Sequence, residues 1–162
     1  MRDQQNSSRG LRPFNRPVST RVRMGLVMRK GMDFGAMGDV ETALRMQGVA
    51  LAPISTGETS LMVSGVAVMA TATADDINTG KVKGLVVPGG VEDAAGEAQA
   101  RVLIQLAREK GLPVFGFGEG VALIAAISGE AVEGDGAVFH AQGVAAIQDR
   151  DAMAKAVDAA AA

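Results

Sequence analysis

The sequence predicts an α/β domain with a three-layer, flavodoxin-like architecture, in which helices cover a parallel sheet of about five strands. Short apolar runs alternate along the chain with longer stretches that have the i, i+3, i+4 spacing of helices. The runs are apolar at consecutive positions, which is typical of parallel strands buried on both faces. Two runs end in glycine clusters, at 88–90 and 116–120. Because such sheets bind ligands beyond the carboxyl ends of their strands, we expect the functional site there.

The first half of the domain is predicted to form two strands, a helix, two short extended pieces and a helical turn. In chain order these are a strand at 22–28, a helix of about ten residues ending at Gly48, a strand at 49–54, the two parts of 61–69, and a turn with Thr73 as its N-cap. Met24, Met28, Met32, Met37 and Met46 lie in and around the first strand and helix, where filling of the core explains them best.

The second half is predicted to form four more strands and three more helices. In chain order these are a strand at 82–87, a helix at 93–110, a strand at 114–117, a helix at 121–127, short strands at 137–141 and 144–147, and a final helix capped by Asp149. The predicted buried face of the helix at 93–110 consists of Ala95, Ala98, Val102, Leu103 and Leu106.

The sequence predicts a flexible, Arg-rich arm at 1–20 followed by one domain at 21–162, and charge is unevenly distributed along the chain. Residues 1–30 carry eight Lys and Arg against one acidic residue, whereas residues 31–162 carry eight against seventeen, a net charge of −9. The chain has no run of apolar residues long enough to span a membrane, and its start lacks the apolar core of a secretory signal. The cytoplasm is therefore the predicted compartment, and an organelle transit peptide is the alternative.

The amino-acid composition of the chain excludes several classes of chemistry. The chain has no Cys and a single histidine, His140. It therefore has no disulfide, no zinc–thiolate site, no thiol nucleophile and no multi-histidine metal site. No cofactor and no metal ion are predicted. The acidic pairs at 75–76 and 92–93 are explained by solvated helix starts.

The cluster at 116–120 predicts a sharp strand–turn–helix elbow. The dinucleotide-binding pattern G-x-G-x-x-G/A does not fit, because its last position falls on Val121 or Leu123, and the chain has no Gly-Lys-Ser/Thr sequence for a phosphate loop. Hydrolase elbows of this shape hold a Ser or Cys in a strained backbone conformation. Here the central residue is Gly118, which adopts that conformation freely but brings no nucleophile.

Two segments, LVVPGG at 85–90 and LPVFGFGEGVALI at 112–124, resemble the ThiJ/PfpI superfamily, which has the class I glutamine amidotransferase-like fold. The resemblance covers about 21–160. Within the superfamily, the sequence GEGV at 118–121 is most similar to the C-terminal domains of large-subunit catalases, which have lost the nucleophile. It implies that Gly118 replaces the nucleophilic Cys, that Glu119 replaces its neighbour, and that Ala36 replaces a supporting Glu. Because the nucleophile and its supporting carboxylate act together, their joint absence favours a site that no longer performs catalysis.

The favoured hypothesis is therefore a non-catalytic domain that serves as an oligomerisation, structural or small-ligand-binding module. Its predicted ligand-binding residues are Gly89, Gly90, Gly118, Glu119 and Gly120. The resemblance implies a homodimer. The alternative is a hydrolase or lyase acting on a small carbonyl or acyl substrate, with Glu119 as general base and the amides of Gly89, Gly90 and Gly120 stabilising an oxyanion.

Three further candidates carry weaker signals. His140 lies in a late strand with no carboxylate partner in the sequence, so a structural or surface role is expected. Ser64 and Ser128 each precede a glycine but lack the G-x-S-x-G pattern, so both are expected to be ordinary serines. Six arginines in the first 23 residues make polyanion binding a third hypothesis. An arm that lies on the acidic domain is the favoured interpretation, because that domain would repel a nucleic acid.

Overall fold

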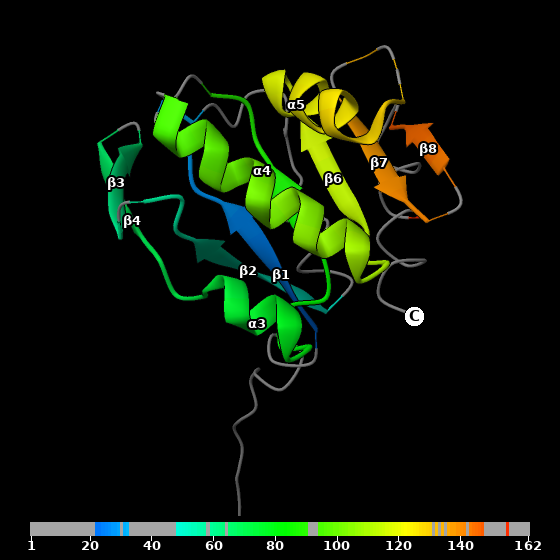
Figure 1. Cartoon of the computed structure of the whole chain (residues 1–162). Coiled ribbons are helices and arrows are strands. Elements are labelled where there is room, and N and C mark those ends of the chain that lie inside the picture. The colour runs from blue at the N-terminus through cyan, green and yellow to red at the C-terminus, as the bar shows by residue number, and fades with distance from the viewer. Residues whose placement is uncertain are drawn as a thin grey trace, which may run out of the picture.

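The computed structural model describes residues 22–29, 31–32, 48–57, 59–63, 65–90, 94–130, 132, 134, 136–141, 143–147 and 155. Its centre is a six-stranded sheet with the strand order β2-β1-β5-β6-β7-β8 (Figure 1). The strands are β1 (Val22–Val27), β2 (Val49–Ile54), β5 (Leu85–Val87), β6 (Val114–Phe117), β7 (Gly136–His140) and β8 (Gly143–Ala146). The predicted α/β class with a flavodoxin-like parallel core is confirmed.

The sheet is parallel only in part, which corrects the prediction of an all-parallel sheet. Strands β2, β1, β5 and β6 are parallel, but β7 runs antiparallel to β6 and β8 antiparallel to β7. The two late strands, predicted at 137–141 and 144–147, are observed at 136–140 and 143–146, so only residues 141–142 separate them. Two strands joined by so short a turn form a hairpin, because a parallel connection needs a crossover of a dozen or more residues.

A second, two-stranded sheet is formed by β3 (Ser60–Val63) and β4 (Val66–Met69), which pair antiparallel. Gly65 supplies the positive φ, +81°, that its turn requires. This hairpin confirms the two short extended pieces predicted within 61–69. It lies at one side of the molecule, on the side where α4 begins (Figure 1).

The short helix α3 (Ala74–Asn78) follows, and Thr73 is its N-cap as predicted. The Asp76 carboxylate accepts a hydrogen bond from the Thr73 backbone N–H at 2.9 Å. This contact is half of a capping box, and it accounts for Asp76 as part of a helix start.

Two longer helices, α4 (Ala94–Glu109) and α5 (Glu119–Ser128), pack on the sheet (Figure 1). The face of α4 that is buried consists of Ala100, Leu103, Ile104 and Ala107. Of the predicted face only Leu103 is buried and Leu106 is half-buried, while Val102 is 53% exposed, so that prediction was wrong. The helix is rich in alanine, which is small enough to be buried or exposed, so alanines do not distinguish one face of the helix from another. The face that is buried is the one that contains the large side chains of Leu103 and Ile104.

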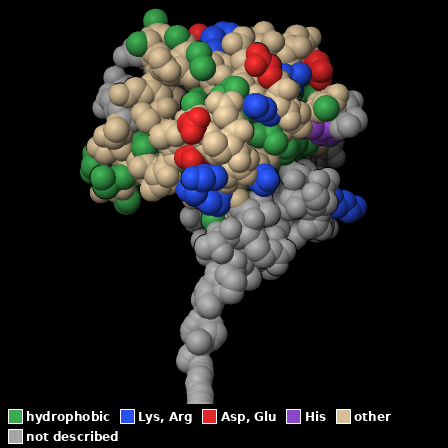
Figure 2. Space-filling model, turned by 60° about the horizontal axis from the view of Figure 1, so that its bottom comes forward, with side chains coloured by type: hydrophobic (Ala, Val, Ile, Leu, Met, Phe, Trp, Pro, Cys, Tyr) green, Lys and Arg blue, Asp and Glu red, His purple; other side chains and the backbone are tan. Residues whose placement is uncertain are grey.

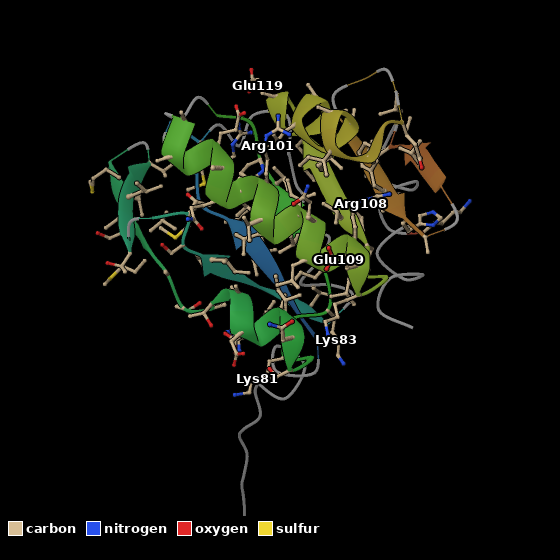
Figure 3. All side chains as sticks on the ribbon, viewed as in Figure 1. Lys81, Lys83, Arg101, Arg108, Glu109 and Glu119 are labelled. Atoms are coloured by element: carbon tan, nitrogen blue, oxygen red, sulfur yellow. The ribbon has the colours of Figure 1, made fainter. Side chains whose placement is uncertain are left out.

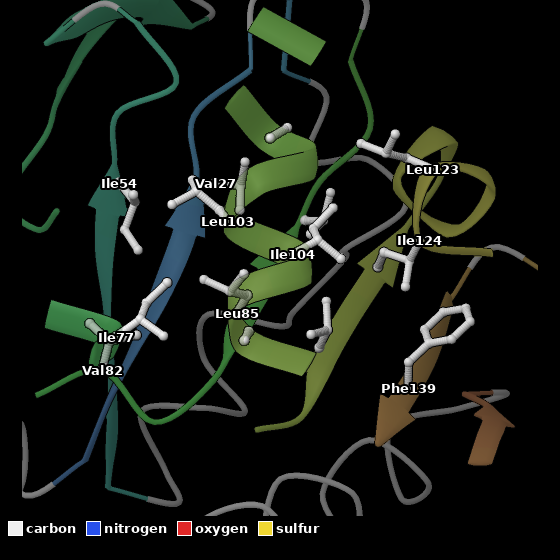
Figure 4. Close-up of a cluster of buried hydrophobic side chains, with 14 of the residues drawn as sticks. Val27, Ile54, Ile77, Val82, Leu85, Leu103, Ile104, Leu123, Ile124 and Phe139 are labelled. Carbon is white, nitrogen blue, oxygen red and sulfur yellow. The ribbon is translucent and has the colours of Figure 1, made fainter. Parts of the chain in front are cut away.

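The hydrophobic core lies between α4 and the sheet (Figure 4). Leu103 and Ile104 of α4 meet Val27 and Leu85 from the centre of the sheet, and Phe139 extends the core under α5. Each fully buried side chain of this size contributes about 1.5–3 kcal/mol relative to exposure. Three of the predicted core methionines, Met24, Met28 and Met32, are buried as expected.

Several predictions fall outside the described residues. They are the arm at 1–20, the helix between 33 and 47 with Ala36, Met37 and Met46, the serine at 64, the acidic pair at 92–93, and the helix capped by Asp149. Among the described residues, no helix combines the length and the apolar character that crossing a membrane requires.

Candidate functional site

The parallel strands place three loops at the same edge of the sheet. Strand β1 ends before residues 28–29, β5 before 88–90, and β6 before Gly118. Glu119 lies at this edge, where α5 begins, and Lys81 and Lys83 lie at the opposite end of the molecule (Figure 3). Both predicted glycine clusters therefore meet at the carboxyl edge, where α/β sheets bind their ligands.

Gly118 has the backbone conformation of the predicted elbow. It is the N-cap of α5, with φ +56° and ψ −131°, and its carbonyl accepts a hydrogen bond from Val121 N–H at 3.1 Å. An L-residue in this conformation is strained by about 1–3 kcal/mol, and glycine is not. The predicted elbow conformation is therefore present, and glycine brings no side chain to it.

The two flanking glycines allow α5 to lie directly on the sheet. A Cβ added at Gly120 would overlap the carbonyl of Val87, and one added at Gly116 would lie 2.7 Å from Ile124 Cδ1 and 3.1 Å from Val121 N. The start of α5 thus contacts the backbone of β5 with no side chain between them. These glycines serve packing, and they would be needed whether or not the site performs chemistry.

Glu119 binds back onto the 88–90 loop. Its Oε1 accepts a hydrogen bond from the Gly90 N–H at 3.1 Å, although the residue as a whole is exposed. A Cβ added at Gly89 would overlap the same Oε1, so Gly89 leaves the room that the carboxylate occupies. The structure therefore joins the predicted residues Gly89, Gly90 and Glu119 by direct contact.

The sequence analysis missed Arg29, the one polar side chain that is buried in the described part of the chain. It is 5% exposed, and its Nη1 donates a hydrogen bond to the Pro88 carbonyl at 3.0 Å. A charged residue directly after the apolar strand β1 was the available signal, because that position faces the carboxyl edge. Arg29 links the loop after β1 to the loop that holds Glu119.

The site as described offers few groups that could react. A carboxylate is present, but it already holds the Gly90 N–H, which is one of the donors that the alternative hypothesis assigns to an oxyanion. No group of three or more metal-ligating side chains occurs among the described residues. The arrangement is a packed junction between three loops with one exposed carboxylate.

The remaining candidates do not reach this edge. His140 ends β7, and because Phe139 pairs with Val114 it lies beside the amino end of β6, the end away from Gly118. Ser128 is the last residue of α5, about 14 Å along the helix from its start. Its Oγ accepts a hydrogen bond from the Glu130 N–H at 3.3 Å, which is an ordinary helix-end contact.

Comparisons with known proteins define the fold. No protein-family profile and no curated protein sequence matches the chain. Solved structures do match, and all three described here have 12% sequence identity to this chain. The match to a candidate protease I from Bacteroides thetaiotaomicron covers 85% of this chain and 98% of that one, with a TM-score of 0.63. The match to a ThiJ/PfpI domain protein from Brachyspira murdochii covers 88% of this chain and 95% of that one, with a TM-score of 0.62. The match to DJ-1beta from Drosophila melanogaster covers 86% of this chain and 88% of that one, with a TM-score of 0.55.

These likenesses show that the chain has the fold of the DJ-1/ThiJ/PfpI superfamily, as the resemblance at residues 85–90 and 112–124 implied. At 12% identity they show the fold alone. Function has to be argued from the site, because one fold carries many activities.

Proposed function

We propose that this chain is a non-catalytic domain of the DJ-1/ThiJ/PfpI type, which acts through its surfaces as an oligomerisation or structural module. The observation that carries the proposal is Gly118, whose backbone has the elbow conformation without a nucleophile. The relation to C-terminal domains of large-subunit catalases belongs to the same proposal, since those domains combine this fold with a missing nucleophile.

The carboxylate of Glu119 supports the proposal. A working oxyanion site keeps its amide donors free for the charge that develops on the substrate. Here the Gly90 N–H is already bound to Glu119, and a negative carboxylate beside it opposes any second negative charge. A small ligand at this edge would have to displace that contact.

The alternative hypothesis makes Glu119 a general base for a hydrolase or lyase. Its basis is the position of the carboxylate at the carboxyl edge of the sheet, next to the backbone amides of the 88–90 loop. The similar structure from Bacteroides thetaiotaomicron is described as a candidate protease I. Covalent protease chemistry needs a nucleophile, and Gly118 supplies none.

The test compares the wild-type chain with Glu119→Gln in assays of ester hydrolysis, glyoxalase activity and deglycation. We expect both proteins to give the rate of buffer alone, because no described group can form a covalent intermediate at the elbow. Glu109→Gln is the matched control, since Glu109 is another exposed carboxylate that lies at the far end of α4. A wild-type rate that Glu119→Gln abolishes and Glu109→Gln preserves would establish the alternative.

A further inference from the structure

The β3–β4 hairpin carries two exposed methionines. Met62 of β3 is 66% exposed and Met69 of β4 is 64% exposed. With Val66, they are three of the four large hydrophobic side chains that are exposed in the described part of the chain. Hydrophobic side chains gather at the side of the molecule where the hairpin lies (Figure 2). Solvent therefore reaches most of both methionine side chains, on a surface that is largely apolar.

Both methionines lie on one face of the hairpin. In its ladder Ser60 pairs with Met69, and Met62 pairs with Ala67. Directly paired residues point to the same side of a sheet, and residues two apart along a strand do so as well. Met62 and Met69 are therefore diagonal neighbours, about 7–8 Å apart. A chemical change at the two sulfurs acts on the same small area of surface.

The other three methionines that the structure describes are buried. Met24 is 2% exposed, Met28 is 0% exposed and Met32 is 6% exposed. The chain has no cysteine, so the thioethers of methionine are its only sulfur groups. A dissolved oxidant reaches an exposed sulfur far more readily than a buried one. Among the described residues, Met62 and Met69 are thus the sulfurs that such an oxidant meets first.

Packing and strand propensity do not account for methionine at these two positions. β-Branched and aromatic residues are preferred in strands, and the hairpin follows this preference at Val63, Val66 and Val68. A buried methionine fills irregular gaps in a core, but side chains that are about two-thirds exposed fill none. What distinguishes methionine from leucine or valine at an exposed position is the chemistry of its sulfur.

The surface around the two sulfurs is uncharged. Residues 59–74 contain no charged side chain, and this run of 16 is the longest uncharged run in the chain. Oxidation converts the apolar thioether of methionine to a polar sulfoxide and adds no net charge. Because exposed apolar patches are the places where proteins make contacts, the change from thioether to sulfoxide alters the contacts that this surface can form.

We propose that Met62 and Met69 form a site of reversible oxidation, at which hydrogen peroxide converts both thioethers to sulfoxides and makes this face of the hairpin polar. At each sulfur an S–O bond forms while the O–O bond of the peroxide breaks. The sulfur loses two electrons, and the peroxide is reduced to water. Methionine sulfoxide reductases reverse the step with a dithiol as reductant: the sulfoxide oxygen leaves as water and the dithiol becomes a disulfide.

The first test treats the full chain with limiting hydrogen peroxide and locates the added oxygen by peptide mass spectrometry. We expect Met62 and Met69 to gain oxygen at least about ten times faster than Met24, Met28 and Met32, because burial protects the latter three. The same experiment in denaturing urea is the control. There all five sulfurs are exposed, and we expect their rates to be equal.

The second test measures the apolar surface by hydrophobic-interaction chromatography. We expect the oxidised wild type to elute earlier than the untreated protein. Reductases for both sulfoxide epimers, supplied with dithiothreitol, should restore the original retention. The matched control carries Met62→Leu and Met69→Leu, which keep apolar side chains and remove the two sulfurs. Its retention should change much less after the same treatment.

Thermal unfolding separates a change of the surface from damage to the fold. We expect the oxidised wild type to keep its Tm within about 2 °C, because changes at exposed side chains have small effects on stability. A larger decrease would mean that oxidation unfolds the hairpin, and it would overturn the proposal.

Each of the other outcomes decides the proposal as well. Equal rates for the exposed and the buried methionines of the native chain would overturn it. So would an equal change of retention in the wild type and the leucine variant, or a sulfoxide form that the two reductases do not restore. The site is separate from the elbow, so a catalytic rate in the Glu119 assay would refute the non-catalytic function and leave these measurements unchanged.

Discussion

The elbow and the β3–β4 hairpin differ in how their surfaces are used. At the elbow the backbone of α5 lies directly on the end of β5, and Glu119 binds the Gly90 N–H. On the hairpin the side chains of Met62 and Met69 are about two-thirds exposed, at 66% and 64%. The carboxyl edge of the sheet, where α/β folds bind ligands, is thus already occupied by the chain's own contacts, whereas the apolar side chains on the hairpin are exposed.

This difference shows which features of the elbow indicate function. Gly116 and Gly120 are required by the close approach of α5 to β5, so their presence reports packing alone. Position 118 has the strained backbone conformation in which hydrolase elbows hold a Ser or Cys, and here it is a glycine. The exposed positions of Met62 and Met69 on the hairpin have no comparable packing requirement, because polar side chains would be tolerated there as well.

The largest predicted effect tests the packed side of this comparison. Gly120→Ala should lower the free energy of unfolding by about 3 kcal/mol, because the added Cβ overlaps the Val87 carbonyl, a backbone atom that cannot move aside cheaply. Gly111→Ala is the matched control. Gly111 has φ +73° but open space around it, so only its conformational strain of about 1 kcal/mol is expected. Urea denaturation of the two variants measures both values.

Equal losses for the two variants would mean that α5 does not lie directly on β5 in solution. Backbone conformation would then account for both glycines, and the elbow would no longer count as the tightly packed region of the molecule.

A smaller effect should separate the two faces of the hairpin. Val63→Ala should cost about 2 kcal/mol, since it removes two buried methyl groups from the covered face. Met62→Ala should change the free energy of unfolding by less than about 0.5 kcal/mol, because that side chain is largely exposed. Thermal unfolding of both variants measures the two values. A large loss for Met62→Ala would show that the face of the hairpin that carries Met62 is covered in solution.

Much of the fold could be predicted from the pattern of apolar runs. The strand predicted at 82–87 is observed at 85–87, and the helix predicted at 93–110 is observed at 94–109. Both predicted segments are followed at once by a proline or a glycine, which marks their ends in the sequence. The direction of β7 and β8 was missed, although their separation by two residues was visible. The buried face of α4 was also missed, since alanines on neighbouring stripes make the helical periodicity ambiguous.

The site could be predicted where backbone geometry decides it. Gly118 was placed by the strand–turn–helix pattern, and its φ of +56° agrees. The contact between Glu119 and Gly90 joins residues 29 positions apart, so no local pattern contains it. Arg29 was missed because its burial depends on the loop after β5, and an arginine in a loop ordinarily indicates solvent exposure.

The smallest predicted effect concerns the self-occupied site. Glu119→Ala should lower the free energy of unfolding by about 1 kcal/mol, because it removes the acceptor of the Gly90 N–H and a negative charge at the start of α5. Glu119→Gln should lose about half as much, since its amide oxygen still accepts the hydrogen bond. Urea denaturation of the three proteins in one buffer resolves the order.

Glu109→Ala is the control for this series, because Glu109 is an exposed carboxylate at the end of α4 rather than at a helix start. A negative charge near a helix C-terminus is unfavourable, so its removal should leave stability unchanged or slightly raised. If Glu119→Ala is as stable as the wild type, the carboxylate is not held by Gly90 in solution. The Gly90 N–H would then be free for a ligand, and the contrast between a filled elbow and an open hairpin would fail at the elbow.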